Sequence, residues 1–224
     1  MTSYGQFCPV AKAMEVLDER WTLLIVRELL LGSTHFNELR RGVPKMSPAL
    51  LSKRLRSLER AGIVHREVDA QRTSYTLTRS GTDLLDVVNA LGLWGLRWIP
   101  ELGDEDLDPH LLFWDIRRTV PVERWPRGRT AVAFEFPDVP GRSSRWWLVV
   151  TGDDVDVCDA DPGYEVVATV RMPLRLLTRI WRGEERWHHA ENRGDLVVAG
   201  SARARRELPE WIGRSALATL AAAR

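Results

Sequence analysis

The feature that most constrains the fold is one amphipathic helix with sharp ends, predicted between Ser47 and Gly62. Serine is a favoured helix N-cap and proline suits the first helical position, so Ser47 followed by Pro48 marks a helix start. A glycine just after the last apolar position marks the end. Between these limits the leucines recur at helical spacing and form one apolar stripe, made of Leu51, Leu55 and Leu58.

The opposite face of this helix is small and basic. It consists of Pro48, Ala49, Ser52, Lys53 and Arg56. A slim N-terminal end can approach base edges in a major groove, and the cations can reach phosphates. This face therefore predicts a helix that enters a DNA groove, with a plain solvated face as the alternative interpretation.

Two helical segments precede this helix. Apolar residues at helical spacing over residues 9–31 predict one segment, which Gly32 ends. Residues 36–41 predict a short amphipathic helix, with Phe36 and Leu39 facing inward.

A hairpin and another helix follow it. The runs 63–68 and 73–78 alternate in strand fashion around a short polar turn, which predicts a hairpin with Arg72 at its tip. A further amphipathic helix is predicted over residues 84–98. The order of helix, short helix, basic helix and hairpin is that of a winged helix-turn-helix.

Charge and tryptophan are unevenly distributed along the chain. The 224 residues carry a formal charge of +1, yet residues 34–80 hold ten basic and four acidic side chains, whereas residues 101–161 hold seven and fourteen. Trp21 is the one tryptophan before Trp94, and nine fall from there onward. A basic stripe favours a nucleic-acid partner, and the two halves of the chain indicate separate cores.

Composition limits the class of protein. The apolar fraction of 44% suffices for a buried core, no apolar run is long enough for a membrane span, and the start lacks the layout of a secretory signal. Two cysteines give no disulfide framework, so we expect a cytoplasmic protein. The acidic segment 101–110 is interpreted as a linker between domains 1–100 and 111–224.

Several blocks within residues 5–98 resemble the HxlR-type branch of the MarR-like winged-helix regulators. They are Phe7-Cys8-Pro9-Val10, Arg20-Trp21-Thr22-Leu23-Leu24-Ile25, Phe36-Asn37-Glu38-Leu39, Ser47-Pro48 with Leu51 and Leu55, residues 58–64, and Tyr75-Thr76-Leu77-Thr78 with Gly81. The resemblance implies a bacterial transcription regulator that binds double-stranded DNA as a homodimer. Its subunits would pair through outer helices, here Val10–Leu17 and Leu84–Trp98. The chain departs from the family pattern at Glu19-Arg20 and at His35.

On this interpretation, two copies of the Ser47–Gly62 helix would enter successive major grooves of a pseudo-palindromic operator. We expect base contacts from Ala49, Ser52 and Lys53. The full set of expected DNA-binding residues is Arg40, Arg41, Ser47, Pro48, Ala49, Ser52, Lys53, Arg56 and Arg72.

Cys8 is a candidate redox sensor, because the resemblance includes members with an oxidant-sensing cysteine at this place. It precedes Pro9 and a predicted helix start, with Lys12 one turn along, a setting that lowers a thiol pKa. The alternative interpretation is a small apolar residue packed at a dimer seam.

The C-terminal half predicts an α+β domain, with a mostly antiparallel sheet and helices grouped late in the chain. Residues 168–213 resemble the sterol carrier protein type 2-like fold, which implies an apolar tunnel and an effector pocket for a hydrophobic molecule. The candidate pocket residues are Trp146, Leu148, Leu177, Trp181 and Trp187, with Arg179 or Arg182 as a carboxylate anchor. Ordinary core tryptophans would give the same pattern.

Catalysis finds no support in the sequence. It contains no phosphate-binding loop, dinucleotide fingerprint or zinc-protease motif, so we expect no enzyme activity, no cofactor and no metal site. The prediction is a dimeric DNA-binding regulator modulated by a hydrophobic small molecule. The alternative is a hydrophobic-ligand carrier or buffer that uses the winged helix only to dimerise.

Overall fold

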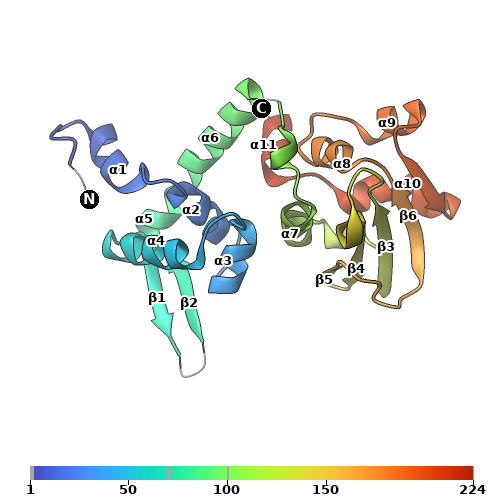
Figure 1. Cartoon of the computed structure of the whole chain (residues 1–224), viewed down its shortest axis with the longest axis horizontal. Helices are drawn as coiled ribbons and strands as arrows, with labels where there is room; N and C mark the ends of the chain where they lie inside the picture. Colours follow the sequence, from blue (N-terminus) through green and yellow to red (C-terminus); the bar gives the residue numbers. More distant parts are fainter. Residues whose placement is uncertain (1–2, 70–71, 100, 224) are drawn as a thin grey trace. The chain divides into compact units, whose positions relative to one another are not determined.

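The computed structural model describes residues 3–69, 72–99 and 101–223. Ala70 and Gln71, which belong to the turn of the expected hairpin, lie outside the described residues. The chain groups into two compact units, Met1–Trp94 and Gly95–Arg224, called unit 1 and unit 2 here (Figure 1).

Unit 1 is helical apart from one hairpin. Its elements are α1 (Pro9–Leu17), α2 (Thr22–Leu30), α3 (Phe36–Gly42), α4 (Pro48–Arg60), β1 (Val64–Val68), β2 (Thr73–Leu77), α5 (Arg79–Thr82) and α6 (Leu85–Trp98), whose last turn belongs to unit 2. The two strands pair antiparallel, from Val64 opposite Leu77 to Val68 opposite Thr73. This is the order of elements expected for a winged helix-turn-helix.

The core of unit 1 is built around α4. The predicted leucine stripe of this helix is its buried face, and no member is more than 1% exposed. Ile25 and Val26 of α2 and Leu39 of α3 belong to the same apolar cluster. One face of α4 is thereby fixed in the core, so its other face is the one offered to a partner.

The expectation of a single helical segment over residues 9–31 is wrong. The chain forms two helices there, because α1 ends at Leu17 and α2 begins only at Thr22. Between them, Trp21 adopts φ +81°, a left-handed conformation that residues other than glycine rarely take. The spacing of the apolar side chains is compatible with one continuous helix, but the backbone leaves the helical conformation at Trp21.

Unit 2 combines a five-stranded sheet with helices. Its strands are β3 (Arg129–Glu135), β4 (Arg145–Thr151), β5 (Asp154–Cys158), β6 (Val166–Arg171) and β7 (Val197–Gly200). Its further helices are α7 (Pro109–Thr119), α8 (Leu174–Trp181), α9 (Trp187–Arg193), α10 (Ala202–Ile212) and α11 (Ala216–Ala222). Short 3-10 turns connect some of these elements, namely η1 (Asp104–Asp106), η2 (Val122–Arg124) and η3 (Gly141–Ser144). The strand order is β5-β4-β3-β6-β7, and β3 and β6 are the one parallel pair among these strands. The sheet is therefore mostly antiparallel, as expected.

Two expectations about the helices of unit 2 need correction. Helices are not confined to the end of the chain, because α7 precedes every strand of the sheet. It begins inside the expected linker, where the Asp108 carboxylate accepts hydrogen bonds from the backbone N–H groups of His110 and Leu111. Helix α10 continues through Pro209, although proline ordinarily breaks the interior of a helix. Leu208 and Trp211, on the two sides of the proline, are both buried, and this packing outweighs the lost helical hydrogen bond.

Candidate nucleic-acid interface

Helix α4 presents a basic surface whose position is set by local capping and by the core. The Ser47 hydroxyl accepts a hydrogen bond from the backbone N–H of Leu50 at 3.3 Å, and Pro48 occupies the first helical position. Lys53 and Arg56 are exposed on the face opposite the leucine stripe. An exposed helix face with cations and a narrow N-terminal end has the shape and charge that suit a DNA groove.

Helices α2 and α3 are joined by Arg27, which pairs with the buried carboxylate of Glu28. Glu28 of α2 is 0% exposed and ion-paired with Arg27 at 2.8 Å. The Arg27 guanidinium also donates to the carbonyl of Gly42, the last residue of α3, at 3.0 Å. The end of α3 is thus tied to α2, which fixes the loop that leads into α4.

The other end of α3 is held by Glu38. Its carboxylate accepts hydrogen bonds from the backbone N–H groups of Thr34 at 2.8 Å and His35 at 3.0 Å. Partial burial raises the pKa of Glu38, but these backbone donors and the neighbouring imidazole outweigh it, so the pKa lies below its ordinary value. The carboxylate therefore stabilises the first turn of α3 at neutral pH, and this contribution is lost as the pH falls through the lowered pKa.

The hairpin is attached to the helical core along β2. The backbone N–H of Tyr75 donates to the Thr34 carbonyl at 2.8 Å, and Ser74 forms a bridge with His35. The outer part of the hairpin is exposed, and Figure 1 shows it extending away from the helices. Arg72 lies at its exposed end, next to the turn. The hairpin therefore presents the guanidinium of Arg72 at its exposed end.

The structure places the expected DNA-binding residues on α3, α4 and the hairpin of unit 1. Ser52 is half-buried. The others are exposed, namely Arg40, Arg41, Ser47, Pro48, Ala49, Lys53, Arg56 and Arg72. Their roles as DNA contacts stay predictions.

Two arginines of this region were missed by sequence reasoning. Arg66 is exposed on β1, and its place in the wing could have singled it out. Arg54 lies between Lys53 and Arg56 in the sequence, but its side chain is only 12% exposed and is ion-paired with Glu19. No sequence signal distinguishes Arg54 from its basic neighbours, because its partner lies in the turn between α1 and α2.

Cys8 stands immediately before α1 and is half-buried. The backbone N–H groups of Ala11 and Val10 lower the pKa of its thiol below the ordinary value. The thiol of Cys158 on β5 differs, because burial and the nearby carboxylates of Asp156 and Asp159 raise its pKa. Cys8 is therefore the more readily ionised of the two, and thiolate is the reactive form of cysteine.

The candidate effector-pocket residues all lie in the core of unit 2. Trp146, Leu148, Leu177, Trp181 and Trp187 are 0–6% exposed and belong to one apolar cluster. Arg179 and Arg182 lie beside Glu184, with which each forms an ion pair. This packing is also what an ordinary core would show, so a ligand-binding role stays a prediction.

Among the described residues, no group of three or more histidine, cysteine or acidic side chains is placed to hold a metal ion. The same part of the chain contains no helix long and apolar enough to cross a membrane.

Comparison with known proteins matches unit 1. A family model described as HxlR-like helix-turn-helix matches residues 16–102. YvaP from Bacillus subtilis, described as an HTH-type transcriptional regulator, is 38% identical over 99 residues, which cover 42% of this chain and 92% of YvaP. YdeP from the same organism, described in the same words, is 34% identical over 94 residues, covering 41% of this chain and 73% of YdeP.

Solved structures match a similar share of the chain. The redox regulator HypR in its oxidised form is 35% identical, with a TM-score of 0.38, and the match covers 40% of this chain and 96% of HypR. Each of these matches leaves more than half of this chain uncovered. Since residues 16–102 match the family model and YvaP is matched over nearly its whole length, the chain belongs to the HxlR-like helix-turn-helix family.

Proposed function

We propose that the chain is a DNA-binding transcription regulator in which α4 enters the major groove. The observation that carries this proposal is the division of α4 into two faces. Its leucine face is buried in the core, and its other face exposes Lys53 and Arg56. The relatives described as HTH-type transcriptional regulators support the same function.

The contacts divide by chemistry. Arg40, Arg41, Lys53, Arg56 and Arg72 supply phosphate contacts, which give affinity without sequence information. Ala49, Ser52 and Lys53, near the N-terminal end of α4, contact base edges and give selectivity.

We propose further that the protein acts as a homodimer through α1 and α6. The apolar side chains of Val87, Leu91, Trp94 and Trp98 recur at helical spacing along α6, and each is 42–61% exposed. Val10 and Met14 form a second exposed apolar pair, one turn apart on α1. Exposed apolar stripes of this length are typical of a protein interface. In the dimer, two copies of α4 meet half-sites about one helical turn apart on a pseudo-palindromic operator.

Fluorescence anisotropy of labelled duplexes tests this function. The full-length protein is titrated into DNA from upstream of its own gene and into an unrelated duplex of equal length, at two salt concentrations. We expect tight, selective binding to the upstream DNA and a steep loss of affinity with salt. Absence of binding to either duplex at the lower salt concentration would refute the proposal and favour the ligand-carrier alternative.

For unit 2, we propose a sterol carrier-like fold that binds a hydrophobic effector. One buried side chain supports this proposal. The indole nitrogens of Trp125, Trp146 and Trp181 each donate a hydrogen bond, whereas the buried Nε1 of Trp187 has no partner among the described residues. Because an unsatisfied buried donor is costly, an amphipathic ligand with a carbonyl or carboxylate oxygen would be stabilised next to it.

A fluorescent fatty acid, cis-parinaric acid, is a suitable probe for unit 2. We expect saturable binding to the full-length protein, and weaker binding to Trp187→Phe, which keeps an aromatic ring but removes the donor. Equal binding by both proteins would exclude the Trp187 Nε1 as a hydrogen-bond donor to the ligand. Repeating the DNA titration with the probe present shows whether binding in unit 2 changes operator affinity.

A further inference from the structure

Arg54 differs from every other cation on α4 in what it contacts. Its guanidinium forms an ion pair with the carboxylate of Glu19, and its Nε donates to the carbonyl of Arg20 at 3.2 Å. Both acceptors belong to the turn between α1 and α2. Arg54 therefore faces this turn, whereas Lys53 and Arg56 are exposed and Lys53 borders the pocket described below.

The turn that Arg54 contacts leads into a residue with an unfavourable backbone conformation. Trp21 follows the two acceptor residues directly and has φ +81°. Holding a residue with a side chain in this region costs free energy, so surrounding contacts have to maintain it. The guanidinium of Arg20 stacks over the Trp21 ring, 5.2 Å from its centroid. With the Arg54 contacts, this gives the turn one fixed geometry relative to α4.

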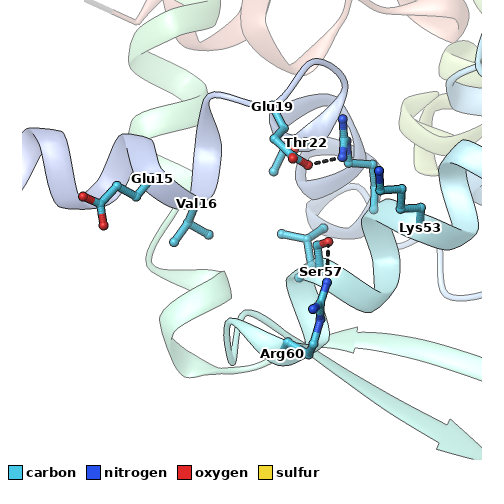
Figure 2. A pocket seen from close by; sticks show the side chains of 9 residues that line it. Glu15, Val16, Glu19, Thr22, Lys53, Ser57 and Arg60 are labelled. Carbon is cyan, nitrogen blue, oxygen red and sulfur yellow. Dashed lines mark hydrogen bonds and ion pairs between the residues drawn. The ribbon is translucent and has the colours of Figure 1, made fainter. Parts of the chain in front are cut away.

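Close packing does not join α1 to α4 along their whole length. A pocket of about 250 Å³ lies between them. Its lining includes Glu15 and Val16 from α1 and Ser57, Leu58 and Arg60 from α4 (Figure 2). Side chains that border a pocket restrain each other less than close-packed ones. Beside this pocket, the contacts of Arg54 join α4 to the turn, while Val16 and Leu17 of α1 pack against the apolar core.

We propose that Arg54 is a positioning residue, which sets the orientation of α4 for DNA through Glu19 and the Arg20 carbonyl without contacting DNA itself. This inference rests on the proposed DNA-binding function. It also defines a physical route between two surfaces, since α1 carries the exposed Val10 and Met14 at the proposed dimer contact. A displacement of α1 in the dimer would reach α4 through the Glu19–Arg54 pair.

Salt dependence separates a positioning arginine from a phosphate-binding one. Each lost phosphate contact makes the negative slope of log affinity against log salt shallower by about 0.9, so a substitution present in both subunits of the dimer makes it shallower by about 1.8. We expect Arg54→Ala to weaken operator binding by about tenfold with an unchanged slope, whereas Arg56→Ala weakens binding and makes the slope shallower. A slope shallower by about 1.8 in Arg54→Ala would show a direct phosphate contact and overturn the proposal, as would an unchanged affinity.

The Glu19–Arg54 pair is tested by a double-mutant cycle. If Arg54 acts through Glu19, then Glu19→Gln weakens binding as well, and the double variant binds no more weakly than Arg54→Ala alone. Additive losses would mean that the two side chains act independently, which contradicts the proposal. Circular dichroism and thermal unfolding of each variant confirm that the fold is retained.

Failure of the DNA-binding function itself would give a different result. In that case the wild-type protein binds no duplex, and the same cycle is measured on thermal unfolding midpoints of the full-length chain. Non-additive shifts for Glu19→Gln and Arg54→Ala would preserve the mechanical link between the turn and α4. Additive shifts would overturn it.

Discussion

The carboxylate of Glu28 occupies the space that a side chain at position 42 would need. A Cβ built on Gly42 would overlap the Glu28 side chain, which is completely buried and ion-paired with Arg27. Glycine is therefore required at the end of α3 by the approach of a charged group, and φ at this position is not in the left-handed region. The contact fixes α3 against α2 directly before the loop that leads to α4.

Replacing Gly42 with alanine is expected to destabilise unit 1 by about 1–3 kcal/mol, because the methyl group has to displace a buried carboxylate. Urea unfolding followed by circular dichroism measures the loss. Asn37→Ala is the control, because Asn37 is exposed on the same helix. It should leave stability nearly unchanged, as surface substitutions usually do. Equal effects of the two substitutions would contradict the steric explanation.

Replacing Lys53 or Arg56 with alanine is expected to weaken operator binding at least about tenfold at moderate salt. Each substitution removes a proposed phosphate contact from each subunit of the dimer, so the negative slope of log affinity against log salt should become shallower by about 1.8. Arg203→Ala is the control, because this exposed arginine lies on α10 in unit 2 and is ion-paired with Glu207. If Lys53→Ala and Arg56→Ala both bound like Arg203→Ala, α4 would not be the DNA-contacting helix.

A charge placed in the apolar stripe of α6 is expected to dissociate the dimer. Leu91→Glu would put a carboxylate in the middle of the proposed contact, where it would be desolvated without a partner. Analytical ultracentrifugation should show a shift from dimer to monomer at micromolar concentration. Val197→Glu introduces the same charge at a residue 58% exposed on β7, and it should leave the assembly unchanged. If the Leu91→Glu variant remained a dimer, the interface would have to lie elsewhere on the protein.

The two thiols are expected to react at different pH. Because backbone donors lower the pKa of Cys8 and nearby carboxylates together with burial raise that of Cys158, alkylation of Cys8 should rise at lower pH than that of Cys158. Iodoacetamide labelling at a series of pH values, followed by peptide mass spectrometry, measures both profiles. The Cys8→Ser variant should retain only the profile with the higher midpoint. The reverse order of midpoints would refute the pKa assignment.

Elements defined by local rules could be predicted well from the sequence. The limits of α4 depend on a serine N-cap, a proline and a glycine, and its buried face depends on leucine spacing, so all are visible in one short segment. Helix α7 starts with the same signal, Asp108 followed by Pro109, yet its acidic surroundings favoured a linker. Both the exposed cations of α4 and its core face follow from the pattern of the segment itself.

Features that depend on distant partners could not be predicted. Arg54 lies between the basic residues Lys53 and Arg56 in the sequence, and Glu19 comes close to it only in the folded chain. Trp21 has no local preference for the left-handed conformation that it adopts between α1 and α2. At Pro209, helix propensity predicts a break, but burial of Leu208 and Trp211 keeps α10 intact.

The single parallel pairing in the sheet has a consequence for synthesis of the chain. Strand β3 obtains its first neighbour, β4, almost at once, but its second neighbour, β6, begins only at Val166. During translation at about 5–20 residues per second, one edge of this central strand stays open for on the order of seconds. The strand is apolar over residues 131–134 and its open edge carries unpaired backbone groups, which are the features that promote wrong strand pairing between nascent chains. Slow elongation between Glu135 and Val166 would therefore lower the yield of folded protein more than slow elongation after β7.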